Sequence, residues 1–307
     1  YGGGYGNAFQ FSAVSINWGG DRAVSWGGEG NFDGEKIDYF SISTPGNATA
    51  FGDVHRDVDG FGPGKHGGTC VSDTTYGVYA GGQSSHNLNP TDQIDYITFA
   101  TPGNSSDFGT LTKKQMRRPA GGTDGTIGVI AGGQDDWTGA TYYTGADTFT
   151  IATPGNATLS SFTLSTGANQ TCGTNDKTRM IIAGGYTNGN ASNDLIQYLT
   201  FATPGASSTF GDLVSNRPYG TATSNLTHAL IAGGYENVSS LNLATTDVIT
   251  IQTTGNATNF GDLSRVKRAM GGASNGTYAT FGGGFPNNIV EIDRYNFASA
   301  STATDHG

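Results

Sequence analysis

The stretch Leu230-Ile231-Ala232-Gly233-Gly234, an apolar run that ends in two glycines, recurs along the chain and decides its fold. The other full copies are Ala23-Val24-Ser25-Trp26-Gly27-Gly28, Gly77-Val78-Tyr79-Ala80-Gly81-Gly82, Val129-Ile130-Ala131-Gly132-Gly133, Ile181-Ile182-Ala183-Gly184-Gly185 and Thr280-Phe281-Gly282-Gly283-Gly284. Tyr1-Gly2-Gly3-Gly4-Tyr5 reads as a seventh copy whose front is missing. The copies follow one another at about fifty residues, apart from one shorter first step, so the chain is an internal repeat.

Each repeat carries a second landmark, a turn with the sequence Thr-Pro-Gly-Asn. It occurs at residues 44–47, 101–104 and 153–156, and modified copies stand at 203–206 and 253–256. Proline presets φ at the first central position of a turn and glycine supplies a positive φ at the next, which is typical of a type II turn. An alternating strand such as Ile196-Gln197-Tyr198-Leu199-Thr200-Phe201 precedes the turn, and a Phe-Gly-Asp segment such as Phe210-Gly211-Asp212 follows it.

The repeat therefore predicts four short antiparallel strands and no helix. Four strands in about fifty residues are typical of one blade of a β-propeller. Composition is uniform from end to end, so we predict a single all-β domain over residues 1–307, a closed propeller. Seven Gly-Gly segments favour seven blades, and six full-length repeats keep six blades as the alternative.

The two ends of the sequence predict how the ring closes. Ser301-Thr302-Ala303-Thr304-Asp305-His306-Gly307 resembles the first strand of a blade, and Tyr1-Gly2-Gly3-Gly4-Tyr5 resembles a second strand. An open ring leaves unpaired strand edges. We therefore expect residues 1–14 and 299–307 to lie together in one closing blade.

The repeat resembles kelch-type β-propellers, in which an Arg precedes an apolar strand ending in Gly-Gly and an aromatic residue closes the blade. Arg217, Gly233-Gly234 and Phe260 fit one such unit, although kelch repeats usually carry Trp where this chain has Phe. The variant with Gly-Asn-Ala-Thr followed by Phe-Gly-Asp-Leu is similar to kelch-like repeats in virion structural and tail-fibre proteins of tailed phages from aquatic bacteria. That resemblance implies a structural or attachment role on a particle surface. A propeller fold by itself implies no function.

Composition excludes several classes of partner. The formal net charge is −10 and no basic stripe occurs, so we expect no nucleic-acid binding. No apolar run is long enough to cross a bilayer, so we expect no membrane insertion.

No residue pattern points to catalysis, a metal or a cofactor. The five histidines form no metal-binding motif, and Cys70 and Cys172 read as small buried thiols. Asp53, Asp57 and Asp59 could space carboxylates around Ca²⁺, but they lack a complete calcium loop and favour a solvated loop. We therefore predict no enzyme activity and no cofactor.

Arg118, Arg217 and Arg268 each stand three residues before a glycine, and two interpretations remain open. They could form a ring of cations around one rim that attracts an anionic glycan. Alternatively, each could bridge neighbouring blades by pairing with an Asp or with backbone carbonyls, which the kelch pattern favours.

The loops that follow the Gly-Gly segments vary most and should emerge on one face. Variable loops on a constant frame suit recognition. The candidate binding residues on this face are Trp137, Tyr142, Tyr143, Tyr186 and Tyr235.

Nine Asn-x-Ser/Thr sequons occur, and four of them fall at the repeated turn. They are candidate glycosylation sites only if the chain is secreted by a eukaryote: Asn47, Asn104, Asn156, Asn169, Asn190, Asn225, Asn237, Asn256 and Asn275.

The leading hypothesis is a non-enzymatic propeller on a virion surface, or otherwise extracellular. It would serve as a structural or attachment module whose partners are other virion or filament proteins and cell-surface glycans. The alternatives are a secreted glycan-binding propeller, a glycoprotein or filament component and, ranked last, a propeller glycoside hydrolase, for which no carboxylate pair can be singled out.

Overall fold

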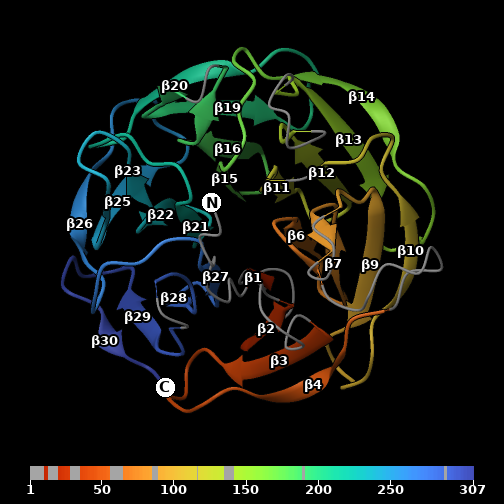
Figure 1. The fold of residues 1–307 in the computed structure, drawn as a ribbon, viewed down its shortest axis with the longest axis horizontal. Coiled ribbons are helices and arrows are strands. Elements are labelled where there is room, and N and C mark those ends of the chain that lie inside the picture. Colours follow the sequence, from red (N-terminus) through yellow and green to blue (C-terminus); the bar gives the residue numbers. More distant parts are fainter. Residues whose placement is uncertain are drawn as a thin grey trace.

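The computed structural model describes residues 10–12, 20–27, 35–55, 65–84, 89–115, 117–134, 142–188, 191–286 and 289–307. Over these residues the chain forms strands and no helix, as the sequence predicts. Six four-stranded sheets stand radially around a central axis, which is the architecture of a β-propeller (Figure 1).

Every blade is an antiparallel sheet whose strands run from the axis to the rim in chain order. Blade 1 contains β1 (Gln10–Ser12), β2 (Arg22–Trp26), β3 (Lys36–Ser41) and β4 (Thr49–Asp53). Blade 2 contains β6 (Thr69–Ser72), β7 (Tyr76–Ala80), β9 (Gln93–Thr98) and β10 (Ser106–Thr110). Blade 3 contains β11 (Ala120–Thr123), β12 (Ile127–Ala131), β13 (Gly145–Thr150) and β14 (Thr158–Thr163).

The second half of the ring repeats this plan. Blade 4 contains β15 (Cys172–Asn175), β16 (Arg179–Ala183), β19 (Leu195–Thr200) and β20 (Ser208–Asp212). Blade 5 contains β21 (Thr221–Ser224), β22 (His228–Ala232), β25 (Thr245–Thr250) and β26 (Thr258–Asp262). Blade 6 contains β27 (Gly271–Ser274), β28 (Tyr278–Gly282), β29 (Ile292–Asn296) and β30 (Thr304–Asp305). Three two-stranded ladders stand apart from the blades: β5 (Lys65–His66) with β8 (Gln83–Ser84), β17 (Tyr186–Thr187) with β18 (Ala191–Ser192), and β23 (Tyr235–Glu236) with β24 (Leu241–Asn242).

The favoured count of seven blades is wrong, and the alternative of six is confirmed. Each of the six full Gly-Gly segments follows the second strand of one blade. The extra segment, Tyr1–Tyr5, lies outside the described residues. It precedes the next copy by only half a repeat, and half a repeat has too few residues for four strands.

The termini do not meet in one blade as predicted. β1 pairs with β2 in blade 1, whereas β30 pairs with β29 in blade 6, so each blade is one continuous stretch of chain. Residues 1–9, 13 and 14 lie outside the described residues. The C-terminal segment Ala303-Thr304-Asp305-His306-Gly307 corresponds to Ala257-Thr258-Asn259-Phe260-Gly261, the outer strand of blade 5, and not to a first strand.

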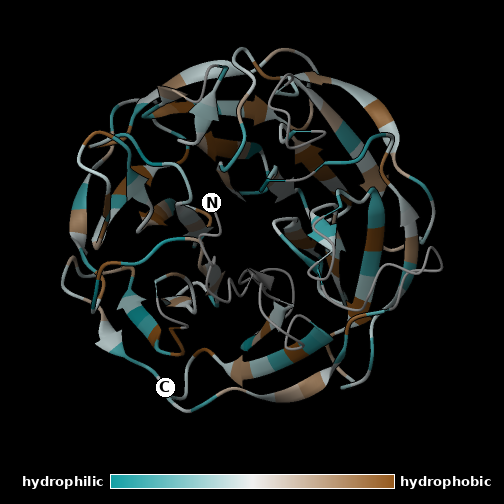
Figure 2. Ribbon diagram, in the orientation of Figure 1, coloured by the Kyte–Doolittle hydropathy of each residue, from teal (hydrophilic) through white to brown (hydrophobic). Residues whose placement is uncertain are grey.

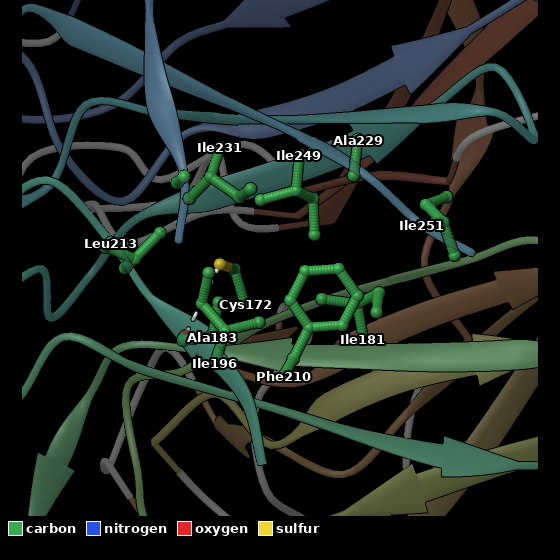
Figure 3. Close-up of a cluster of buried hydrophobic side chains, with 11 residues drawn as sticks. Cys172, Ile181, Ala183, Ile196, Phe210, Leu213, Ala229, Ile231, Ile249 and Ile251 are labelled. Carbon is green, nitrogen blue, oxygen red and sulfur yellow. Dashed lines mark hydrogen bonds between the residues drawn. The ribbon is translucent and has the colours of Figure 1, made fainter. Parts of the chain in front are cut away.

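Apolar side chains fill the spaces between neighbouring blades. Figure 2 shows hydrophobic colour on middle strands such as β12 and β16. Figure 3 shows Ile181 and Phe210 of blade 4 facing Ile249 and Ile251 of blade 5, all of them buried. Because each strand of this kind is covered on both faces, its sequence is apolar at nearly every position.

The repeated turn joins each blade to the one before it. The side-chain oxygen of Asn156 accepts a hydrogen bond from the backbone N–H of Thr110 in blade 2 at 3.1 Å. In the same way Asn104 accepts from Asp53 in blade 1, and Asn256 accepts from Asp212 in blade 4. The glycine of the Phe-Gly-Asp segment lies directly under this turn. A Cβ on Gly109 would stand 2.5 Å from the carbonyl oxygen of Gly155, so only glycine fits.

Candidate binding face

One end of the ring carries two kinds of segment: those that follow the second strand of each blade, and the linkers that enter the first strand of the next. We call it the linker face. The backbone N–H of Gly185 donates to the carbonyl of Arg217 at 3.2 Å, and Gly234 donates to Lys267 at 3.0 Å. These bonds hold each post-strand segment against the linker of the following blade.

Around the axis, neighbouring linkers form backbone hydrogen bonds with one another. Arg118, Gln170, Tyr219 and Ala269 each stand two residues before a first strand, and each has φ between 52° and 61°. Their backbone N–H groups donate to the preceding linker, for example Tyr219 to Gln170 and Ala269 to Tyr219, both at 2.9 Å. A positive φ is unusual for residues other than glycine, and these bonds stabilise it.

Arg118 crosses the axis. It enters between blades 2 and 3, and its Nη2 donates to the carbonyl of Ala269, between blades 5 and 6, at 2.8 Å. Beside it lies a cavity of about 100 Å³ lined by first strands, with Thr69, Thr171 and Thr221 on its wall. Arg118 is buried, 6% exposed, and its hydrogen bond to Ala269 joins opposite sides of the ring.

A second set of cations is buried within the linkers, each four residues before a first strand. Arg217 pairs with Asp247 at 2.8 Å, Lys267 with Asp293 at 2.8 Å, and Lys65 with Asp95 at 2.5 Å. The acids occupy one equivalent position on the third strands. In blade 4 the same positions hold Ala168 and Gln197. Blade 3 keeps the acid, Asp147, but the sequence has Met116 where the cation would stand, and the backbone N–H and the hydroxyl of Thr112 donate to Asp147 instead.

Two of the three repeated arginines, Arg118 and Arg217, have buried partners within the protein. Arg217 pairs with an Asp and donates to the carbonyl of Gly233, and Arg118 donates to a backbone carbonyl, which are the partner types that the bridging interpretation names. Arg118, however, joins opposite sides of the ring and not neighbouring blades. Burial raises the pKa of Asp247 and lowers the pKa of Arg217, while the opposite charge of each partner counteracts both shifts. The three arginines are not structurally equivalent, because they precede their strands by two, four and three residues.

Arg268 is the arginine with a different environment. Its Cζ lies 4.6 Å from the ring centre of Tyr235, 4.5 Å from that of Phe285 and 5.3 Å from that of Tyr219. Tyr186 packs edge-on against Tyr219 at 5.9 Å. All five residues are half-buried, so the group, which we call the Arg268 cage, reaches the surface of the linker face.

The structure brings some of the sequence-predicted binding residues into this group and not others. Tyr186 and Tyr235 belong to it. Tyr142 is buried, and Tyr143 packs on Lys113 at 4.6 Å in blade 3. Trp137 lies outside the described residues.

Sequence reasoning missed Tyr219, Phe285 and the role of Arg268. Tyr219 and Arg268 lie in linkers, where only the arginines recur in the sequence. Phe285 follows Gly283-Gly284 in the slot that Tyr186 and Tyr235 occupy in their own repeats. That shared slot was the available signal.

The remaining candidate residues have structural surroundings. The thiols of Cys70 and Cys172 are free, and burial raises the pKa of Cys172 to about 12. Burial and the charge of Arg118 lower the pKa of His66 to about 4. In the described part of the chain, His, Cys, Asp and Glu form no cluster of three that could hold a metal ion. Asp53 pairs with Lys36 at 2.7 Å, whereas Asp57 and Asp59 lie outside that part.

The sequons differ in how far their side chains are exposed. The side chains of Asn47, Asn104, Asn156, Asn237 and Asn256 are exposed. Asn169 is fully buried, Asn225 and Asn275 are half-buried in turns between first and second strands, and Asn190 lies outside the described residues.

Comparison with known proteins identifies no relative, so the function is inferred from the fold and the candidate site. No known family model matches the chain, and no curated protein is significantly similar to it. No helix among the described residues is long and apolar enough to cross a membrane.

Proposed function

We propose that this chain is a non-enzymatic recognition module, displayed on the surface of a virion or otherwise outside the cell, that binds glycans through its linker face. The observation that carries the proposal is the Arg268 cage. Aromatic rings bury the apolar faces of sugars, and half-exposed rings held on a constant frame provide such a surface. The cage gathers Tyr186, Tyr219, Tyr235 and Phe285 from blades 4 to 6 and their linkers.

The virion setting is supported by the resemblance of the repeat to kelch-like tail-fibre proteins. It predicts that the chain is a component of purified particles. Mass spectrometry of particles purified from their host would detect the chain in stoichiometric amounts. Recovery from the particle-free medium alone would instead favour the secreted alternative.

Glycan recognition is tested with the double variant Tyr186→Ala/Tyr235→Ala on a glycan array. We expect the unsubstituted chain to retain a defined subset of glycans and the double variant to lose them, because both rings leave the surface. Leu159→Ala is the matched control, since Leu159 is 63% exposed on the outer strand of blade 3, away from the cage. Equal retention by the chain and the double variant would contradict the proposal.

A secreted glycoprotein is the second candidate, and the exposed sequons favour it. In Asn104, Asn156 and Asn256 the side-chain oxygen accepts the inter-blade hydrogen bond, which leaves the amide nitrogen, the atom that carries a glycan, pointing away from it. Intact-mass measurement of the native protein before and after enzymatic removal of N-linked glycans separates the two settings, since only a glycosylated chain loses mass.

A further inference from the structure

We propose that Arg268 is the carboxylate-binding residue of this face, so that the ligand contains an acidic sugar of the uronic or sialic type. The inference rests on the proposed function and names its ligand class. It follows from how the guanidinium is enclosed, from its lack of a protein anion, and from how rigidly its neighbours are held.

The rings enclose the guanidinium in a way that leaves it available. Its Cζ lies 4.5 to 5.3 Å from three ring centres, those of Tyr219, Tyr235 and Phe285. Attraction between a cation and ring faces uses none of the N–H···O hydrogen bonds that a guanidinium can donate. Two such donors match the two oxygens of a carboxylate in a bidentate pair.

Neighbouring cations have protein partners that Arg268 lacks. Arg265 and Lys267, in the same linker, pair with Glu291 at 2.5 Å and with Asp293 at 2.8 Å. Among the residues that the structure describes, the guanidinium of Arg268 has aromatic contacts but neither an ion pair nor a hydrogen bond. Its nitrogen atoms are not among the buried unpaired polar atoms, so water or a ligand reaches them.

Arginines elsewhere in the chain show the contrast. Arg179 and Arg294 also stack on tyrosine rings, at 4.5 and 4.6 Å, but each donates to a backbone carbonyl, at 3.1 and 3.0 Å. Those arginines use their in-plane donors to join blades. Arg268 lies equally close to aromatic rings, but among the described residues its guanidinium donates to no protein group, so its donors are open to a group from outside.

Backbone hydrogen bonds hold the cage before any ligand arrives. Arg268 and Phe285 exchange two of them, at 3.0 and 2.9 Å. Tyr235 donates to Pro218, and Ala269 donates to Tyr219, both at 2.9 Å. A site fixed in advance loses little conformational freedom on binding. The chain as a whole carries a net charge of −10, so an acidic ligand needs this local cation to bind.

The test compares two matched pairs of ligands by isothermal titration calorimetry. One pair is oligogalacturonate and its methyl ester; the other is sialyllactose and lactose. In each pair only the acidic member carries a carboxylate. We expect the unsubstituted chain to bind the acidic member of at least one pair about tenfold or more tightly than its neutral partner, as a charge-assisted hydrogen bond allows. The pair that shows the difference identifies the sugar type.

Three variants assign that difference to Arg268. Arg268→Gln should abolish the preference for the acidic member, and Arg268→Lys should retain part of it, because lysine keeps the charge but loses the fork. Arg265→Gln removes an equal charge from the same linker and should leave the preference unchanged. Melting temperatures confirm that each variant is folded.

The outcomes separate this inference from the proposed function. Equal binding of acidic and neutral members, with loss of both in Tyr186→Ala/Tyr235→Ala, overturns the carboxylate site and leaves glycan recognition intact. An equal loss of preference in Arg265→Gln and Arg268→Gln also overturns it, since general charge would then be responsible. Binding of no member of either pair, together with an empty glycan array, overturns both.

Discussion

At the scale of single residues, the buried cation pairs show why this chain tolerates charge in its interior. Arg217 and Asp247 are both fully buried and are joined at 2.8 Å, with further bonds from Arg217 to Gly233 and Thr245. Removing one member leaves the other charge buried and unpaired. We expect Arg217→Met to reduce the free energy of unfolding by about 3–5 kcal/mol in a denaturant titration.

Two further variants identify the cause of this loss. Arg217→Met/Asp247→Asn should lose less than Arg217→Met alone, because no uncompensated charge remains. Lys36→Met breaks the exposed pair with Asp53 and should have little effect, since solvent already screens that pair. A double variant less stable than the single would show that Arg217 acts through packing and not through its charge.

At the scale of the element, we expect substitution of the glycine in a Phe-Gly-Asp segment to cost far more stability than substitution of the glycine in the repeated turn. A Cβ on Gly211 would overlap the carbonyl oxygen of Gly255 in the next blade, whereas Gly155, at the tip of a turn, has no neighbour within 4 Å of such an atom. We expect Gly211→Ala to lower stability by about 1–3 kcal/mol, the usual cost of overpacking. Gly155→Ala should change it little. Similar melting temperatures for the two variants would contradict the inter-blade contact.

The strands were predictable because their signals are local and repeat. Three local patterns each predict one part of a blade: the apolar run ending in Gly-Gly, the alternating third strand and the repeated turn. The structure confirms that a four-stranded blade is built from these parts. The Arg268 cage was not predictable in the same way. Tyr219, Tyr235 and Phe285 lie in three different segments far from Arg268 in the sequence, and only the folded ring brings them around its guanidinium. The arginines looked equivalent because a one-residue offset in a linker does not alter the repeat pattern.

At the scale of the whole molecule, the seam between blades 6 and 1 repeats the contacts found at the other seams, with one substitution. The carbonyl of His306 accepts a hydrogen bond from Gly46 at 2.7 Å, as the carbonyl of Phe210 does from Gly255 at 2.8 Å. The C-terminus therefore lies at the rim beside the loop between β3 and β4 (Figure 1). His306 stands where other blades have Phe, and reading that His as a Phe would have shown the C-terminal segment to be an outer strand.

This histidine makes the seam sensitive to acid. His306 is 2% exposed, its ring lies 5.4 Å from that of Phe40, and its Nε2 donates to the carbonyl of Ser41 at 2.8 Å. Its Nδ1 is buried without a partner, so a proton there would be unpaired. Burial lowers the pKa of His306 below its usual value of 6.5, and the folded state therefore binds this proton less readily than the unfolded state. The stability that depends on a neutral His306 is therefore fully present above pH 6.5 and is lost as the pH falls from there through the folded-state pKa.

His306→Phe should remove this part of the acid sensitivity. Phenylalanine restores the residue of the other blades and cannot take up a proton, so the variant should lose less in melting temperature between pH 7 and pH 5 than the unsubstituted chain. His66, whose pKa is lowered to about 4, is present in both proteins, so its contribution cancels from the comparison. Hydrogen exchange at pH 5 should then show faster opening of β3 and β29 in the unsubstituted chain than in the variant, because those strands flank the seam. An equal loss of melting temperature in both proteins would mean that acid weakens the ring at another place.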